Sequence, residues 1–347
     1  MKVLVRATNW IGDAIMALPA IRAVHNRPDT QVSVLARGYV ADIYRDQNVA
    51  DEMIAYENTG KHAGFVGRER LASELRARKF DVAVLLQNAF DAAWLAWRAG
   101  IPERIGYARD ARSMLLTQAI PVPKTGEFPP HEKFYYLELL RRAGWIDSVP
   151  NEPFIALHVK ESARQRAADL LRAAGARTSA LRVAIGAGAA YGSAKCWLPS
   201  RFAETANQLQ SQWDADVILF GAAGEADVSL AITAEMSRTP IDLTGKTAIA
   251  DLPALLSQCH VFVGNDSGAM HVAAAVGLPT VGIFGPTDPL GTAPVTPRHT
   301  IVRRQSYCSP CFLRRCPIDH RCMTRITAEQ VLTAVDPWLS AAAVERV

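Results

Sequence analysis

The chain has 347 residues, of which 49% are hydrophobic and 21% are charged, and its formal net charge is +4 at pH 7. This length is sufficient for two domains of ordinary size, and the composition is that of a soluble globular protein. The first residues already have a strand pattern, and glycines and a proline interrupt the longest uncharged run, 267–287. The sequence therefore predicts neither a secretory signal nor a transmembrane segment, and we expect a cytoplasmic protein.

Apolar strand-like runs alternate with helical stretches through both halves, an order that predicts parallel sheets covered by helices. The expected strands are 2–6, 31–36, 81–86 and 104–107 in the first half, then 181–186, 216–220, 261–264, 280–284 and 300–303. Turn-forming residues over 147–153 indicate a linker, and a helix over about 160–174 follows it. The expected fold class is α/β, with two doubly wound domains, residues 1–150 and 151–347, that face each other across a cleft.

The first strand ends in the loop 9–13, and a helix with apolar residues at Ile15, Leu18 and Ile21 follows it. Asp13 therefore lies where this helix begins, at the carboxyl edge of the predicted sheet. A carboxylate there stabilises the helix dipole by about 0.3–1 kcal/mol. Alternatively, Asp13 is a general base that accepts a proton from a substrate hydroxyl. The residues alone leave both alternatives open.

The first strand of the second half leads into 186–199, a loop of small residues that carries one cation, Lys195. Such a loop suits a diphosphate whose negative charge grows as it leaves, although a solvated lysine is the alternative. The spacing is not that of a P-loop, so ATP hydrolysis is not predicted. Glu225 follows the next strand, at a position from which a carboxylate can bind ribose hydroxyls.

The segment Gly264–His271 is the most informative part of the chain, because it joins an apolar strand to a helix of small residues. Such a turn puts backbone N–H groups and the positive end of a helix dipole at the carboxyl edge of a sheet, where a phosphate can bind. Gly264 and Gly268 permit close approach of the backbone, and Ser267 and His271 add side-chain donors. An ordinary capped helix start is the alternative.

Residues 298–325 contain seven arginines against a single acidic residue, Asp319, which gives this segment a charge of +6. A basic segment suits an anionic partner such as a phosphorylated membrane surface, and a solvated charged loop is the alternative. Aromatic residues do not alternate with these arginines as a stacking surface for nucleic acid would require, so we expect no nucleic-acid partner.

The same segment contains four of the six cysteines: Cys308, Cys311, Cys316 and Cys322. A cytosolic cluster of this kind is more often metal-binding or redox-active than disulfide-bonded. The spacing allows a tetrahedral structural zinc site, with an iron–sulfur centre and free or reversibly oxidised thiols as alternatives. We expect the neighbouring arginines to lower the pKa values of these thiols, and the zinc to hold the segment in shape without taking part in catalysis.

Three motifs, over 9–13, 188–197 and 265–271, occur in the order and spacing of the bacterial lipopolysaccharide heptosyltransferases of glycosyltransferase family nine. The chain resembles these enzymes from its first strand to about Pro289. The resemblance implies the GT-B arrangement of two Rossmann-like domains, inversion at the anomeric carbon, and catalysis that requires no cofactor. It also implies that the first domain binds the acceptor and the second binds the nucleotide sugar.

The substrates that the resemblance implies are ADP-heptose, as donor of L-glycero-D-manno-heptose, and the heptosyl-Kdo inner core of lipopolysaccharide at the inner membrane surface. Carried over by motif, Asp13 would deprotonate the acceptor hydroxyl and Lys195 would neutralise the departing phosphates. Glu225 would hold the ribose, and Asp266 would bind hydroxyls of the heptose. The other implied donor-binding residues are Tyr191, Ser267, Gly268 and His271.

The acidic groups of such an acceptor need cations from the first domain, and Arg109 and Arg112 are the candidates unless they are only solvated surface residues. Two other functions remain open: a nucleotide-sugar epimerase of the same architecture, and a sugar-nucleotide-binding protein without catalytic activity. The presence of both Asp13 and Lys195 argues against the binding protein. The basic segment argues mildly against the epimerase, whose substrate is a small soluble molecule.

Overall fold

The computed structural model describes residues 1–150, 152 and 154–344. The chain divides into two compact units, residues 1–152 and 153–347. This division falls within the segment 147–153 where the sequence predicts the linker, of which residues 151 and 153 lie outside the described residues. Residues 345–347 of the predicted second domain also lie outside them.

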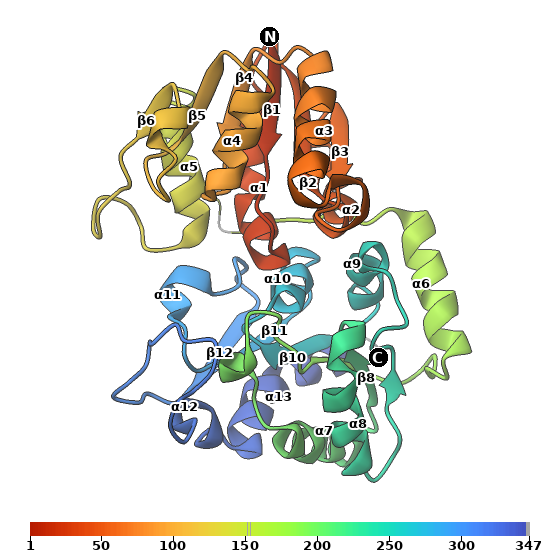
Figure 1. The fold of residues 1–347 in the computed structure, drawn as a ribbon. Coiled ribbons are helices and arrows are strands. Elements are labelled where there is room, and N and C mark those ends of the chain that lie inside the picture. The colour runs from red at the N-terminus through yellow and green to blue at the C-terminus, as the bar shows by residue number, and fades with distance from the viewer. Residues whose placement is uncertain (151, 153, 345–347) are drawn as a thin grey trace. The chain divides into compact units, whose positions relative to one another are not determined.

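Unit 1 is built on a six-stranded parallel sheet in the order β3-β2-β1-β4-β5-β6 (Figure 1). Because the order reverses between β1 and β4, the crevice at their carboxyl ends is the topological switch point where such sheets bind ligands. The strands are β1 (Lys2–Arg6), β2 (Gln31–Arg37), β3 (Glu52–Tyr56), β4 (Val82–Leu85), β5 (Glu103–Tyr107) and β6 (Gln118–Ile120). The α-helices are α1 (Ile11–His25), α2 (Gly38–Tyr44), α3 (Gly64–Ala77), α4 (Phe90–Arg98) and α5 (Glu132–Arg142).

Unit 2 repeats this topology with the order β12-β11-β10-β7-β8-β9, again parallel, and its switch point lies between β7 and β10. Its strands are β7 (Arg182–Gly186), β8 (Asp216–Phe220), β9 (Ile241–Asp242), β10 (Val261–Asn265), β11 (Thr280–Phe284) and β12 (His299–Arg303). Its α-helices are α6 (Glu161–Ala173), α7 (Pro199–Trp213), α8 (Ala226–Ala234), α9 (Leu252–Leu256), α10 (Gly268–Ala275), α11 (Pro289–Thr292), α12 (Arg321–Thr324) and α13 (Ala328–Val344).

The predicted fold class is confirmed, since each unit is a parallel, doubly wound α/β sheet, and every predicted strand is present to within one residue at either end. The sequence did not predict β3, β6 and β9. All three are edge strands, and each is only partly buried along its length. Strands covered on both faces are recognised as continuous apolar runs, whereas short edge strands lack that signal.

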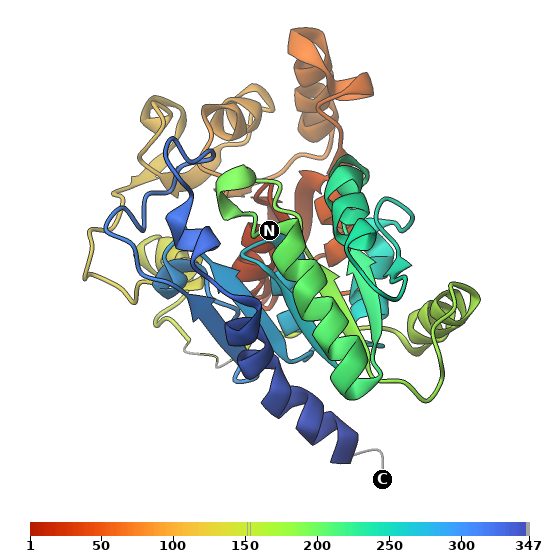
Figure 2. The same cartoon turned by 90° about the horizontal axis from the view of Figure 1, so that it is seen from below.

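The core of unit 2 explains why its central strands are so apolar. Val183 and Ile185 of β7, like Val261 and Val263 of β10, have no exposed surface. Helices α7 and α13, which lie side by side (Figure 2), cover one face of this sheet. Trp197, in the loop before α7, is buried in the same cluster and donates its indole N–H to Ile326 O at 3.1 Å.

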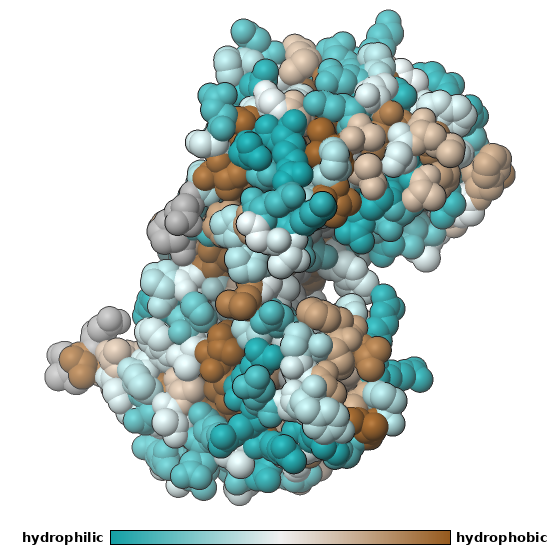
Figure 3. Space-filling view, turned by 90° about the vertical axis from the view of Figure 1, so that its left-hand side faces the viewer, coloured by the Kyte–Doolittle hydropathy of each residue, from teal (hydrophilic) through white to brown (hydrophobic). Residues whose placement is uncertain are grey.

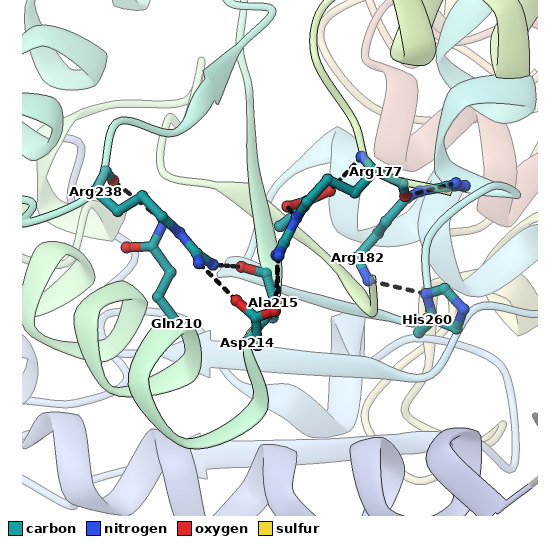
Figure 4. A network of polar contacts seen from close by, with 8 residues as sticks. Arg177, Arg182, Gln210, Asp214, Ala215, Arg238 and His260 are labelled. Atoms are coloured by element: carbon teal, nitrogen blue, oxygen red, sulfur yellow. Dashed lines mark hydrogen bonds and ion pairs between the residues drawn. The ribbon is translucent and has the colours of Figure 1, made fainter. Parts of the chain in front are cut away.

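A network of ion pairs lies at the amino-terminal edge of the second sheet, opposite to the carboxyl ends of its strands (Figure 4). Asp214 pairs with Arg177 at 2.7 Å and with Arg238 at 2.6 Å, and Arg177 also pairs with Asp216 at 2.8 Å. The hydrogen bonds from Arg177 and then Arg238 lower the pKa of Asp214 to about 2. Each charge of this network has an opposite charge beside it, and the network joins the start of β8 to the segments before β7 and β9.

Among the described residues, no helix has the length and apolar character needed to span a membrane. On the face seen in Figure 3, hydrophobic residues are scattered among hydrophilic ones. Scattered apolar residues are normal for a protein surface and indicate no particular partner.

Candidate active site

The second unit gathers the loops after β7, β10 and β11 at the carboxyl end of its sheet. The Asn265 side chain joins the first two loops, because it accepts a hydrogen bond from Trp197 N at 3.0 Å and donates one to Ala187 O at 2.6 Å. The two strands also approach closely where they end, since a Cβ on Gly264 would lie 2.6 Å from Gly186 O. The Gly264–His271 turn is therefore held against the Lys195 loop by the buried side chain of Asn265.

Lys195 and Asp266 form an ion pair within this group of loops. The Nζ of Lys195 lies 2.6 Å from Oδ2 of Asp266, and the two side chains are only 13% and 5% exposed. Thr287, from the loop after β11, donates its hydroxyl to the same carboxylate oxygen at 2.7 Å. The structure thus brings together the one cation and the one acid that the sequence assigns to these two motifs.

The N-terminus of α10 provides the neutral part of this site. Ser267 is the residue before the helix, and its backbone is extended, so it occupies the N-cap position. Its Oγ is buried and has no hydrogen-bond partner among the described residues. A buried hydroxyl without a partner, at the positive end of a helix, is a donor available to an anion. Gly268 begins the helix, and the buried His271 follows within its first turn.

Glu225 lies beside the same loops, on the β8 side. Its carboxylate accepts a hydrogen bond from Ala222 N at 2.8 Å. It also packs against the loop after β7, because a Cβ on Gly188 would lie only 1.9 Å from Glu225 Oε1. Burial, and then the negative charge of Glu225, raises the pKa of the nearby Cys196 thiol. The carboxylate is therefore adjacent to the Lys195 loop, where the predicted ribose contact would require it.

Tyr191 lies on the Lys195 loop and is in contact with its cation. The Nζ of Lys195 is 5.0 Å from the centre of the Tyr191 ring, a cation–π distance. The structure therefore groups Tyr191, Lys195, Asp266, Ser267 and the start of α10 at one edge of one sheet. Their roles toward a donor substrate stay predictions, as does that of Glu225.

In unit 1, Asp13 lies in the first turn of α1, directly beyond the carboxyl end of β1, and it is partly exposed. The N-cap residue of α1, Trp10, makes no capping hydrogen bond through its side chain. Glu132 begins α5, which packs against α1. Burial, and then the charge of Asp13, raises the pKa of Glu132 to about 7. No motif of the sequence indicates Glu132, because only the packing of α5 on α1 brings this carboxyl near Asp13.

The two candidate acceptor cations differ in their surroundings. Arg109 is exposed, pairs with Asp110 at 3.6 Å and donates to the Tyr135 hydroxyl at 3.4 Å. The hydrogen bond to Tyr135 is the main cause that raises the pKa of Arg109, so this guanidinium keeps its charge. Arg109 therefore presents a cation at the surface of unit 1.

Arg112, in contrast, is fully buried. Its guanidinium donates to Tyr107 O and to Asn88 Oδ1, each at 3.0 Å, and also to Gln87 O. Burial lowers the pKa of Arg112 to about 10. These contacts tie the loop after β4 to the end of β5. Binding of an acceptor by Arg112 stays a prediction, and the role that its contacts support is to position that loop.

A cavity of about 200 Å³, which the sequence does not predict, opens at the carboxyl ends of the strands of unit 1. Arg68 pairs with Asp91 there at 3.1 Å. Three buried atoms of its walls, Nε of Arg37, Nε2 of His62 and Oε1 of Gln87, have no hydrogen-bond partner among the described residues. The polar residues of its walls are Asn9, Arg37, Tyr56, Asn58, His62, Arg68, Gln87 and Asp91. The walls come from segments far apart in the chain, so no single motif indicates this cavity.

The four tail cysteines carry free thiols, and Cys322 is buried. Burial, and then the proximity of the other three thiols, raises the pKa of Cys322, so the predicted lowering is wrong for this residue. Neighbouring arginines favour the charged thiolate, but burial of this thiol disfavours it and has the larger effect. In the part of the chain that the structure describes, no group of three or more His, Cys, Asp or Glu is placed to hold a metal ion. The zinc site stays a prediction.

Comparison with known proteins places these features in a family context. Residues 68–321 match the family model described as glycosyltransferase family 9 (heptosyltransferase). The lipopolysaccharide heptosyltransferase 2 of Salmonella typhimurium is 30% identical over 315 residues, which are 87% of this chain and 88% of that protein. The enzyme of the same description from Escherichia coli is 29% identical over 313 residues, again 87% of this chain and 88% of that protein.

Two solved structures share the fold over nearly the full length. The ADP-heptose LPS heptosyltransferase II of Escherichia coli superposes with a TM-score of 0.81 at 26% identity, over 99% of this chain and 100% of that chain. A glycosyltransferase family 9 protein from Veillonella parvula superposes with a TM-score of 0.86 at 22% identity, over 98% of this chain and 97% of that chain. At that identity, the Veillonella protein supports the fold alone.

Proposed function

Because the chain belongs to glycosyltransferase family 9, the heptosyltransferases, we propose that it transfers a heptose from ADP-heptose to the inner core of lipopolysaccharide. The chain is an enzyme, a glycosyltransferase. In the proposed reaction, L-glycero-D-manno-heptose passes to a hydroxyl of the heptosyl-Kdo acceptor, with inversion at the anomeric carbon and without a cofactor.

The observation that carries the proposal is the group formed by Lys195, Asp266 and Ser267 at the N-terminus of α10. Helix N–H groups and the unpartnered Ser267 hydroxyl are donors for phosphate oxygens. Lys195 adds a positive charge beside them. This combination suits a diphosphate leaving group, because negative charge on the phosphates grows as the bond to the sugar breaks. Glu225, next to the same loops, is the proposed partner of the ribose hydroxyls, and Asp266 that of the heptose hydroxyls.

In the proposed mechanism, the acceptor hydroxyl attacks the anomeric carbon of the donor. The bond between that carbon and the phosphate oxygen breaks, ADP leaves with the electron pair, and Asp13 accepts the proton of the hydroxyl. Aspartate is a weak base, with a reference pKa of about 3.9, so Asp13 assists only as the hydroxyl attacks. Glu132 shares the surroundings of Asp13, and its pKa of about 7 leaves it largely protonated below neutral pH.

Acceptor binding is assigned to unit 1. The exposed guanidinium of Arg109 and the basic walls of the cavity, including Arg37 and Arg68, are the groups that support this assignment. The acidic groups of a lipopolysaccharide core would pair with such cations. We propose that the enzyme acts as a peripheral protein on the cytoplasmic face of the inner membrane. The charge of +6 over residues 298–325 supports this location, because anionic membrane surfaces attract basic segments.

Incubation of the purified enzyme with ADP-heptose, with and without truncated lipopolysaccharide, tests the proposal. We expect ADP release and product formation that depend on the acceptor. If the enzyme isomerised the sugar nucleotide without acceptor, its function would be that of an epimerase and not of a transferase. Binding of ADP-heptose without any turnover would leave a sugar-nucleotide-binding protein. The truncated lipopolysaccharide should end at the first inner-core heptose, so that the hydroxyl expected to attack the donor is free.

A further inference from the structure

The arginine- and cysteine-rich segment of the tail packs directly on the loop that carries Lys195. The backbone N–H of Ala194 donates to Arg314 O at 3.0 Å. The Tyr191 hydroxyl donates to Phe312 O at 2.7 Å. Both contacts join residues more than a hundred positions apart in the sequence. The loop of the proposed diphosphate site and the tail are therefore one hydrogen-bonded assembly within unit 2.

One further hydrogen bond and one close approach of the backbone fix the tail at this place. A ring nitrogen of His320, Nε2, lies 2.7 Å from Ala194 O. Gly192 lets the tail approach, since a Cβ at this position would lie 2.3 Å from Arg314 O. Any larger residue at position 192 would displace the tail, so the close approach of the tail to this loop depends on Gly192. The Cα of Arg314 is thus held next to the turn that presents Lys195.

The side chain of Arg314 shares an aromatic ring with Lys195. Its Cζ lies 5.3 Å from the centre of the Tyr191 ring, and the Nζ of Lys195 lies 5.0 Å from the same centre. The electron-rich faces of a tyrosine ring attract cations. Two cations beside one ring also repel each other, and an anion between or beside them would relieve that repulsion.

The charges of the site are incomplete without such an anion. The carboxylate of Asp266 offsets the charge of Lys195 at 2.6 Å. Arg314 is exposed, and no ion pair of its guanidinium occurs among the described residues. The other donors of the site, the α10 N-terminus and Ser267, are neutral. A nucleoside diphosphate carries more than one negative charge, so Lys195 alone, already paired, leaves most of that charge unmatched.

We propose that Arg314 is a second phosphate-binding cation of the donor site, presented by the tail and oriented by the Tyr191 ring. This inference rests on the proposed function, because the ligand is the diphosphate of the donor and of the departing ADP. Guanidinium groups bind phosphate oxygens through paired N–H donors, which suits a group that must stabilise ADP as it leaves. The basic charge of the tail would then serve the reaction, in addition to any contact with a membrane.

Arg315 provides a matched control, since it has the same charge and exposure and is the next residue in the chain. Binding of ADP, AMP and adenosine to the full-length enzyme is measured by calorimetry for the wild type, Arg314→Gln and Arg315→Gln. We expect Arg314→Gln to weaken ADP binding by about 10-fold or more. Adenosine binding should be unchanged, and Arg315→Gln should stay within about 2-fold of the wild type for all three ligands.

Unchanged ADP affinity in Arg314→Gln would overturn the inference. An equal loss of ADP affinity in Arg315→Gln would also overturn it, because it would indicate only a general electrostatic effect of the basic tail. An equal loss for adenosine would also overturn it, because the substitution would then have disturbed the fold of the site. Arg314→Lys should recover part of the ADP affinity. These binding measurements do not require turnover. If the wild type showed no transfer, the transferase proposal would fail, and that failure is distinct from a failure of the Arg314 inference, which is seen only in ADP binding.

Discussion

The two edges of the second sheet differ in how completely their polar and charged side chains are paired. At the amino-terminal edge, Asp214 has arginines on both sides, and its carboxylate is fully matched (Figure 4). At the carboxyl-terminal edge, Lys195 is paired with Asp266, but the buried Ser267 hydroxyl has no partner among the described residues, and the Arg314 guanidinium has no ion pair there. Matched charges hold segments together, whereas donors left available at the switch point are suited to a ligand. The difference distinguishes the amino-terminal edge, which the ion pairs stabilise, from the carboxyl-terminal edge, where we propose that the donor binds.

The largest effect is expected at the corresponding edge of the first sheet, at Asp13. Asp13→Asn should lower the rate of transfer by about 10²–10⁴-fold, because the acceptor hydroxyl loses its proton acceptor. Affinity for ADP-heptose should remain nearly unchanged, since the donor is assigned to unit 2. The measurements are kcat by ADP release and donor affinity by calorimetry. A near-normal rate in this variant would leave Asp13 with only its effect on the dipole of α1.

Lys195→Ala should lower kcat by about 10²–10³-fold and weaken donor binding less, because charge on the leaving phosphates develops mainly in the transition state. The variant also leaves the buried carboxylate of Asp266 without its cation, so thermal unfolding should be recorded alongside the kinetics. If KM rose while kcat stayed constant, Lys195 would be a ground-state binding contact and the leaving-group role would be wrong.

Asp214→Asn, at the amino-terminal edge, should leave kcat and KM unchanged and lower the melting temperature slightly. Its pKa is about 2 in the folded chain, below the ordinary value of 3.8. The stabilisation is therefore present above pH 3.8 and is lost as the pH falls toward 2. Thermal unfolding from pH 6 to pH 2 should show the wild type and the variant converge at low pH. A large loss of activity in Asp214→Asn would remove the contrast between the edges.

Only a small effect on donor binding is expected from loss of a metal ion at the tail cysteines. If they hold zinc, protein purified without chelators should contain about one zinc per chain, from the single four-ligand set. Metal removal should change donor binding little, and less than Arg314→Gln does, because the hydrogen bonds of Phe312 and Arg314 with the Lys195 loop involve no thiol. Elemental analysis and thiol titration decide this. Protein without metal, with all four thiols reactive, would contradict the zinc site and leave the transferase assignment in place.

Much of the fold could be predicted from local patterns. The buried central strands are continuous apolar runs, and each is followed by a loop of small or polar residues where a helix begins. Such patterns specify the backbone path, so the sequence alone places Asp13, Lys195 and Ser267 at the carboxyl edges of the sheets. The edge strands β3, β6 and β9 were not predicted, because partly exposed strands have a weaker pattern of apolar residues.

The tertiary structure alone decided which distant side chains meet. Arg109 and Arg112 are close together in the sequence, yet Arg109 is exposed and Arg112 is buried among backbone carbonyls. Glu132 acquires its raised pKa only because α5 packs near Asp13. Arg314 reaches the ring of Tyr191 only because the tail folds back onto the Lys195 loop. Residue type and spacing determine a local backbone, whereas burial and charge pairing arise from contacts between segments that the sequence leaves far apart.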